Sequence, residues 1–113
     1  MRAARLRRSG DIQALRTEGR SLRRAAFLAR VRRTDRREAR LAVTAPRTVG
    51  HAVERNRARR RVREAFRRAI DDLTVTTGLD GLDLLVTVRA GGATEEFGAL
   101  VAEASAVLRE ATA

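Results

Sequence analysis

The chain has 113 residues and no cysteine, and all 25 of its basic residues are arginine, giving a formal net charge of +11. This length fits one domain, no apolar run approaches the roughly 18 residues of a membrane helix, and disulfides and signal peptides are not expected, which predicts a cytoplasmic protein. Residues 1–68 carry a net charge of +17 and residues 69–113 a net charge of −6. Such a basic half predicts nucleic acid as partner, ahead of an anionic membrane surface.

Residues 1–10 are rich in arginine and predict a flexible basic arm. Asp11 is typical of an N-cap and Gly19 of a helix end, so we expect a helix over about residues 12–18, with Ile12 and Leu15 facing inward. Residues 22–33 predict a strand that forms a hairpin with residues 38–45 through a charged turn over residues 34–37. Pro46 should end the second strand.

Residues 52 to about 71 predict the clearest helix. Its apolar residues fall within about a 100° sector at 100° per residue, and they are Ala58, Val62, Ala65, Phe66, Ala69 and Leu73. The far side gathers Asn56, Arg59, Arg60, Arg63 and Arg67, with Arg57, Arg61 and Arg68 on a flank. Eight arginines from Arg55 to Arg68 accompany one acid, so their mutual repulsion needs a polyanion to offset it. The free N–H groups at the helix start would add to this attraction, and A-form RNA is the natural partner.

The last third of the chain predicts a scaffold. Residues 74–83 predict a connection, residues 84–88 a buried strand, and Gly91-Gly92 a turn. Thr94 is typical of an N-cap, with Glu95 and Glu96 in the positive first turn of a final helix. The order helix, strand, strand, helix, strand, helix predicts an α/β sandwich with a small sheet.

No residue set indicates catalysis by side chains. His51 is the only histidine, at a helix entrance, where surface or phosphate contact is the usual role, and there is no Tyr, Lys or Cys. The pair Asp71-Asp72 is interpreted as a helix end, and Glu95-Glu96 is explained by the helix dipole. We therefore predict no catalytic residue and no metal site in this chain.

The segment from Val49 to Arg67 resembles the signature of the bacterial ribonuclease P protein subunit. Ala52 is followed by Arg55-Asn56-Arg57 and then by Arg59-Arg60, which is the core of that signature. The resemblance extends over nearly the whole chain, through residues 5–8, 11–12, 19–21, 27, 40–50 and 84–89.

The resemblance implies a two-layer α/β (α+β) sandwich with a small mixed sheet and a left-handed βαβ crossover, against the usual rule. It also implies that the chain assists a ribonuclease P holoenzyme, whose RNA subunit removes the 5′ leader of precursor tRNA with Mg²⁺ bound through the RNA. The implied partners are ribonuclease P RNA and precursor tRNA, without a membrane or a small-molecule substrate. The RNA-binding residues would be Arg55, Asn56, Arg57, Arg59, Arg60, Arg63 and Arg67.

The resemblance further implies a cleft between sheet and helix that holds the leader, with Ile12, Arg16, Phe27, Arg30, Thr44 and Arg47 as its residues. The family often has an aromatic residue at the position of Ile12 and near Arg16 and Arg30, and Pro46 removes a backbone donor beside Arg47. Base stacking in this cleft would therefore be weak or would use arginine planes. Phe27 is open to two interpretations, stacking on a leader base or packing in the core.

Other functions fit the charge less well. A ribosomal or chaperone-like RNA-binding module would share the basic surface but would not need the Arg-Asn-Arg signature. A DNA-binding protein would place the arginine helix in a major groove, but no dimerisation heptads support this. Membrane binding is the weakest alternative, because the apolar face of the basic helix is needed for the core.

Overall fold

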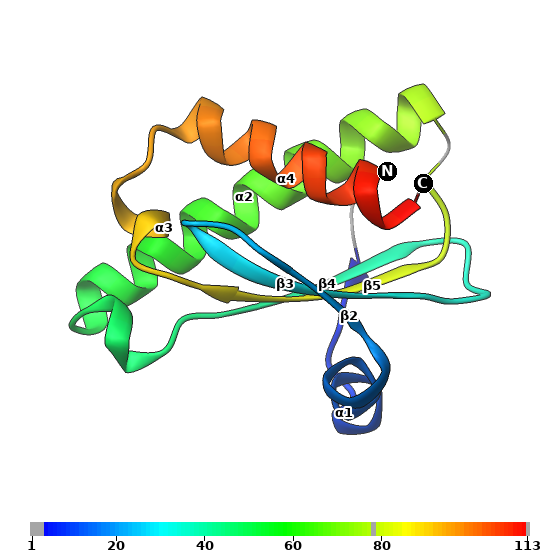
Figure 1. Cartoon of the computed structure of the whole chain (residues 1–113), viewed down its shortest axis with the longest axis horizontal. Helices are drawn as coiled ribbons and strands as arrows, with labels where there is room; N and C mark the ends of the chain where they lie inside the picture. Colours follow the sequence, from blue (N-terminus) through cyan, green and yellow to red (C-terminus); the bar gives the residue numbers. More distant parts are fainter. Residues whose placement is uncertain (1–3, 78, 113) are drawn as a thin grey trace.

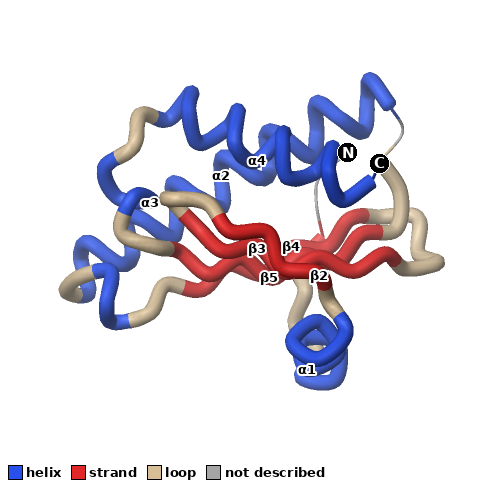
Figure 2. Tube along the Cα trace, in the orientation of Figure 1, coloured by secondary structure: helices blue, strands red, loops and turns tan. Residues whose placement is uncertain are grey.

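The computed structural model describes residues 4–77 and 79–112. Five strands form one mixed sheet in the order β1-β4-β5-β3-β2. These strands are β1 (Ala4–Arg5), β2 (Arg20–Arg23), β3 (Phe27–Arg33), β4 (Ala39–Thr44) and β5 (Leu82–Val88). Helices α2 (Ala52–Thr77) and α4 (Phe97–Thr112) cover one face, whereas α1 (Ser9–Glu18) lies against the other face (Figures 1 and 2). The expected mixed α+β sandwich is confirmed, with α1 as an addition beneath the sheet.

Strand β5 occupies the centre of the sheet, and only Thr87 of its seven residues is not buried, because its mostly apolar residues are covered on both faces and the buried Asp83 is paired with Arg40. It pairs parallel to β4 and antiparallel to β3. The expected hairpin between residues 22–33 and 38–45 is therefore wrong, since β5 separates those strands. The hairpin lies one strand earlier, between β2 and β3, where the Arg24 N–H donates to the Phe27 carbonyl.

The expected flexible arm is also wrong for residues 4–10. Strand β1 pairs parallel to β4, and the N–H of the buried Leu6 donates to the Leu41 carbonyl at 3.0 Å. Helix α1 begins at Ser9, so Asp11 lies in its first turn and is not its N-cap, while Gly19 ends the helix as predicted. Residues 1–3, the rest of the predicted arm, lie outside the described residues.

The main core lies between the sheet and the α2–α4 layer. All six apolar residues of the predicted sector of α2 are buried there, and Phe66 meets Phe27 edge to face at 4.9 Å between ring centroids. A smaller cluster of Leu6, Leu15 and Leu85 lies under α1, with Ile12 packed against it. This second cluster holds α1 on the opposite face of the sheet.

The C-terminal boundaries differ from the predicted ones. Helix α2 continues past Asp71 to Thr77, because the buried Ile70 and Leu73 prolong its apolar side. Gly91–Thr94 forms one helical turn, α3, instead of a simple turn. Helix α4 begins at Phe97, and the Glu96 carboxylate accepts from the Gly98 N–H, so Thr94 is not its cap. No helix in the described part of the chain is long and apolar enough to cross a membrane.

Candidate nucleic-acid interface

The entrance to α2 is shaped by Gly50 and Glu54. Gly50 follows the 3₁₀ turn η1 (Arg47–Val49) and has a φ of 146°, where a side chain would be strained. The Glu54 carboxylate accepts a hydrogen bond from the backbone N–H of His51, as in half of a capping box. One of the N–H groups at this helix start is therefore taken by the chain's own carboxylate. His51 is exposed there, on the surface.

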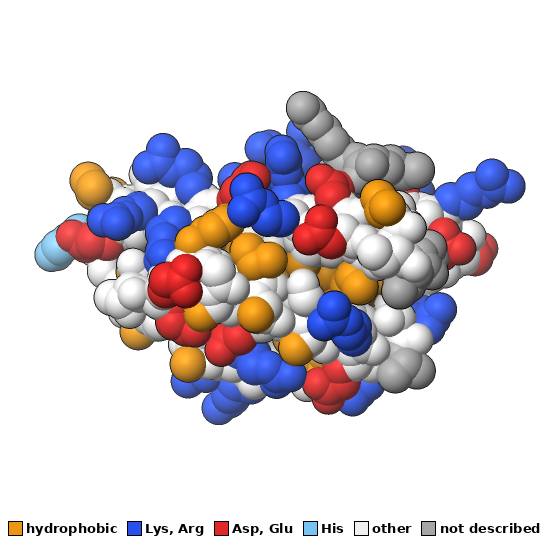
Figure 3. All heavy atoms as spheres, turned by 90° about the horizontal axis from the view of Figure 1, so that it is seen from above, with side chains coloured by type: hydrophobic (Ala, Val, Ile, Leu, Met, Phe, Trp, Pro, Cys, Tyr) orange, Lys and Arg blue, Asp and Glu red, His pale blue; other side chains and the backbone are white. Residues whose placement is uncertain are grey.

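Beyond this entrance, α2 turns a row of arginines to solvent. Asn56, Arg57 and Arg60 are exposed, while Arg55, Arg59, Arg63 and Arg67 are half-buried. Arg59 donates to the Asn56 side-chain oxygen at 2.8 Å, and Arg67 lies 3.6 Å from Glu64. Within the described residues, no ion pair or side-chain hydrogen bond involves the remaining four, which we call the free arginine face: Arg55, Arg57, Arg60 and Arg63. Arginine side chains crowd the end of the molecule where α2 begins (Figure 3).

Two of the three flanking arginines of the same helix, Arg61 and Arg68, have structural partners, whereas the third, Arg57, belongs to the free arginine face. Arg61 donates to the backbone carbonyls of Gly92, at 2.8 Å, and of Glu95, which ties α2 to α3. The guanidinium of Arg68 lies over the Phe97 ring at 5.3 Å from its centroid. The helical period predicts that Arg61 and Arg68 lie apart from the far side of α2, and their contacts with α3, Glu95 and α4 give that position a structural role.

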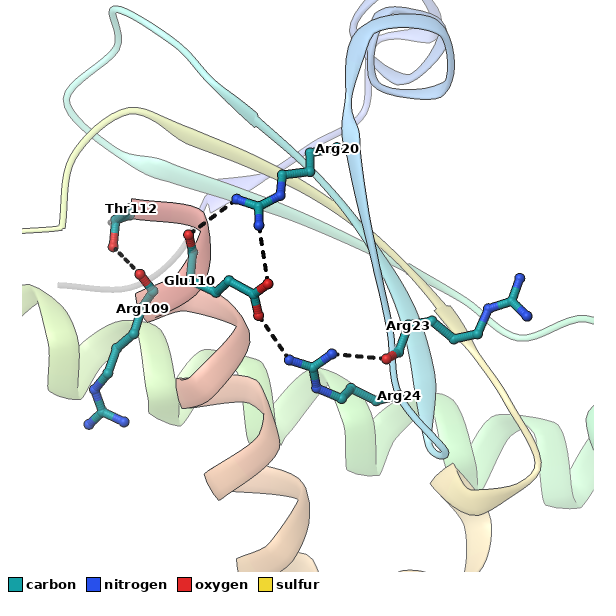
Figure 4. A network of polar contacts seen from close by, with 6 residues as sticks. All are labelled: Arg20, Arg23, Arg24, Arg109, Glu110 and Thr112. Carbon is teal, nitrogen blue, oxygen red and sulfur yellow. Dashed lines mark hydrogen bonds and ion pairs between the residues drawn. The ribbon is translucent and has the colours of Figure 1, made fainter.

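Arginines of the sheet are also held by partners. Arg20 and Arg24 both reach the Glu110 carboxylate of α4, each at 3.1 Å (Figure 4). Arg40 is buried and forms a two-armed contact with Asp83 at 2.6 and 2.8 Å, and it also reaches Asp11 of α1 at 3.2 Å. The hydrogen bonds that Arg40 donates to Asp83 raise the pKa of Arg40 against the opposing effect of burial. Arg40 is thus buried in the scaffold, whereas Arg20 and Arg24 join the β2 side of the sheet to α4 through exposed ion pairs.

The predicted leader cleft maps onto the sheet face that α1 partly covers. Alternation along β3 and β4 places Arg30 and Thr44 on this face, and Ile12 and Arg16 lie one turn apart on α1. Arg47 is exposed on η1 at the rim. Phe27 does not belong here, because it faces α2 and is only 1% exposed, which settles its two interpretations in favour of the core.

Beyond α1 the same face holds a cavity of about 350 Å³ that sequence reasoning missed. Its lining includes Arg23, Leu28, Thr48, Thr87 and Arg89. In β3, Leu28 and Arg30 alternate with the buried residues Phe27, Ala29 and Val31. This alternation in the sequence could have indicated that Leu28 and Arg30 share the other face of the sheet. Arg89 follows β5 and Arg23 ends β2, so only the sheet order brings them together.

The acidic residues do not assemble a metal site. Asp71 and Asp72 lie within α2, so their interpretation as a helix end is wrong, and Glu95 and Glu96 lie between α3 and α4. In the part of the chain that the structure describes, no group of three or more His, Cys, Asp or Glu residues could hold a metal ion.

The sequence was compared with protein families and with individual known proteins. A family model described as Ribonuclease P matches residues 1–112. The chain belongs to the ribonuclease P protein family. The ribonuclease P protein component of Chloroflexus aurantiacus is 39% identical over 111 residues, covering 97% of this chain and 78% of that protein. The component from Gluconacetobacter diazotrophicus is 35% identical, covering 97% of this chain and 92% of that protein.

Solved structures of the ribonuclease P protein share the fold. The protein from Thermotoga maritima superposes with a TM-score of 0.75 at 27% identity, covering 94% of this chain and 96% of that one. The protein from Staphylococcus aureus superposes with a TM-score of 0.73 at 22% identity, covering 96% and 95%. As a ribonuclease P protein component, the chain supports the ribonuclease P holoenzyme, and membership implies an RNA partner.

Proposed function

We propose that this chain binds the RNA subunit of ribonuclease P through the exposed side of α2 and assists removal of the 5′ leader from precursor tRNA in the cytoplasm. The free arginine face supports this most directly, since four arginines on one helix have no acidic partner among the described residues. Family membership supplies the RNA partner. Asn56, Arg59 and Arg67 complete this surface, because they lie on the same side of the helix.

In this proposal the protein contributes position and charge, and the RNA carries out the hydrolysis. Mg²⁺ held by the RNA would stabilise the charge that develops at the cleaved phosphodiester. The arginines of α2 would replace counterions on the RNA, which lowers the repulsion between RNA subunit and precursor tRNA. The side chains supply no metal site for this chemistry within the described residues.

We place the leader on the sheet face beside α1. Arg16, Arg30 and Arg47 border this face from helix, strand and 3₁₀ turn, so they could contact phosphates along an extended single strand. Phe27, the one aromatic residue that the resemblance assigns to this cleft, lies in the core. Stacking of leader bases would therefore use the planar guanidinium groups of these arginines.

Reconstitution tests the function. Purified RNA subunit and this chain should together cleave precursor tRNA at a low Mg²⁺ concentration at which the RNA alone is slow. The protein alone should cleave nothing. Robust cleavage by protein free of RNA, or no stimulation of the RNA subunit, would rule the proposal out.

The leader site has its own test. Arg16→Ala and Arg30→Ala should weaken binding of precursor tRNA to the holoenzyme more than binding of mature tRNA, because only the precursor carries the leader. Arg36→Ala, in the exposed turn before β4, removes the same charge away from this face and is the control. Equal losses for both tRNAs would remove these arginines from the leader site.

A further inference from the structure

A second basic feature lies at the β1 edge of the sheet, where the N-terminal segment meets the α2 surface predicted from the sequence. Strand β1 and α2 enclose a pocket of about 410 Å³. Arginines of both elements line it: Arg5 and Arg7 from the β1 segment, and Arg63 and Arg67 from α2. Leu41 and Val43 of β4 also line it.

The sheet explains why two residues of an arginine-rich N-terminus reach this pocket. Arg5 pairs with Leu41 in the parallel register of β1 and β4, so it lies on the face that α2 covers. Leu6 points to the opposite face and is 4% exposed in the cluster under α1. Arg7, two residues after Arg5, returns to the side of Arg5. Burial of Leu6 thus holds both arginines toward α2.

Three of the four arginines that line this pocket have no acidic partner among the described residues. Arg5, Arg7 and Arg63 have no ion pair within residues 4–77 and 79–112. Arg67 reaches Glu64 at 3.6 Å, and its buried Nε has no hydrogen-bond partner. Burial lowers the pKa of Arg63, and the charges of Arg5 and Arg59 lower it further. Cations that converge from two elements, with one acid among four arginines, are stabilised when an anion binds between them.

We propose that the pocket between β1 and α2 binds a phosphate group of an RNA backbone, held by Arg5 and Arg63. Guanidinium groups match phosphate through two parallel N–H donors, and the pocket has room beyond one phosphate for the attached sugar. The pocket adjoins Arg63 of the free arginine face, so one RNA strand can run from the helix onto the sheet edge. The inference deepens the proposed function by extending its RNA-binding surface to β1.

The test compares two variants that each remove one charge from the full chain. Arg5→Gln should lower the salt slope of binding to ribonuclease P RNA by about one unit, with the slope restored toward wild type by Arg5→Lys. Arg109→Gln is the matched control, because Arg109 is exposed on α4, which contacts the opposite edge of the sheet through Glu110. Thermal unfolding checks that Arg5→Gln folds, as expected for an exposed side chain.

Inorganic phosphate separates the possible sources of the anion. Saturable shifts of the Arg5 and Arg63 Nε–Hε NMR signals with phosphate, together with the smaller RNA slope of Arg5→Gln, support the proposal. Equal slopes for Arg5→Gln and Arg109→Gln would overturn it, since general electrostatics would then suffice. Shifts with phosphate but an unchanged RNA slope would also overturn it in favour of a free anion. Reconstitution with wild-type protein is independent of these outcomes, so failure of this pocket leaves the proposed function standing.

Discussion

Arg60 and Arg61 are neighbours in the sequence but belong to two different regions of the molecule. Arg60 is exposed on the free arginine face and has no partner among the described residues, whereas Arg61 donates to two backbone carbonyls at α3. The same contrast separates Arg40, buried between two carboxylates, from the arginines that project from α2. Net charge therefore overstates the surface that is available to RNA, because part of the arginine content builds the scaffold.

The largest expected effect comes from breaking the scaffold at Arg40. Arg40→Met should destabilise the fold by about 3–5 kcal/mol, since it leaves the fully buried Asp83 carboxylate without its partner. Urea unfolding measures this loss. The salt slope of RNA binding should stay unchanged for the protein that remains folded.

A double variant serves as control for Arg40. Adding Asp83→Leu to Arg40→Met should recover much of the stability, because no buried charge is left unpaired. If Arg40→Met alone unfolds at the wild-type urea midpoint, Arg40 does not stabilise the fold.

Arg61 gives the next largest effect and the sharper contrast, because it lies inside the arginine-rich segment. Arg61→Met should destabilise by about 1–3 kcal/mol, since two carbonyls at α3 lose a charged donor. The RNA salt slope should remain close to wild type. A lowered slope with wild-type stability would place Arg61 in the RNA surface and contradict the division of α2.

The free arginine face should show the reverse behaviour. Alanine at Arg55, Arg60 or Arg63, and also at Arg59, should lower the salt slope by about one unit or less each. For the exposed Arg60, stability should change by no more than about 0.5 kcal/mol. Fluorescence anisotropy with the RNA subunit over a salt series measures the slopes. Unchanged slopes in all four variants would refute this side of α2 as the RNA surface.

The division within α2 was only partly predictable from the sequence. The helical period separates the buried sector from the arginines, because burial of Val62 and Phe66 sets which side faces the sheet. It also separates Arg61 as a flanking residue. The partners of Arg61 are backbone carbonyls about 30 residues away, and no local pattern announces them.

The errors in the fold have the same origin in non-local contacts. The charged turn at residues 34–37 indicates a reversal of the chain, but it cannot show that β5 inserts between β3 and β4. Strand β1 has two residues and depends on pairing with β4, so its composition indicated only a basic arm. The apolar run of residues 84–88 correctly predicted a buried strand, because burial on both faces leaves a local signal.

The smallest expected effect tests whether the acidic half of the chain, like the basic half, holds charged groups without a partner. Glu103 of α4 and Glu95 approach each other, and neither buried Oε2 has a hydrogen-bond partner in the described residues. Burial raises the pKa of Glu103, and the charge of Glu95 raises it further, while Arg24 opposes both. The folded state therefore binds the Glu103 proton more tightly than the unfolded state does.

The sign of the pH dependence follows from this direction. As pH falls through the raised pKa toward the unfolded value, the folded state takes up more protons than the unfolded state, so Glu103 lowers stability less than at neutral pH. Glu103→Gln should raise the free energy of unfolding at neutral pH, by less than Arg40→Met or Arg61→Met lowers it. In mild acid the difference between this variant and wild type should shrink, because Glu103 is then protonated in the wild-type protein. Glu38→Gln, in the exposed turn before β4, is the control. Parallel stability profiles for wild type and Glu103→Gln would show that Glu103 is solvated. In that case Arg24 would offset the repulsion between Glu95 and Glu103. Charged groups without a partner of opposite charge would then be confined to the arginines of α2 and β1.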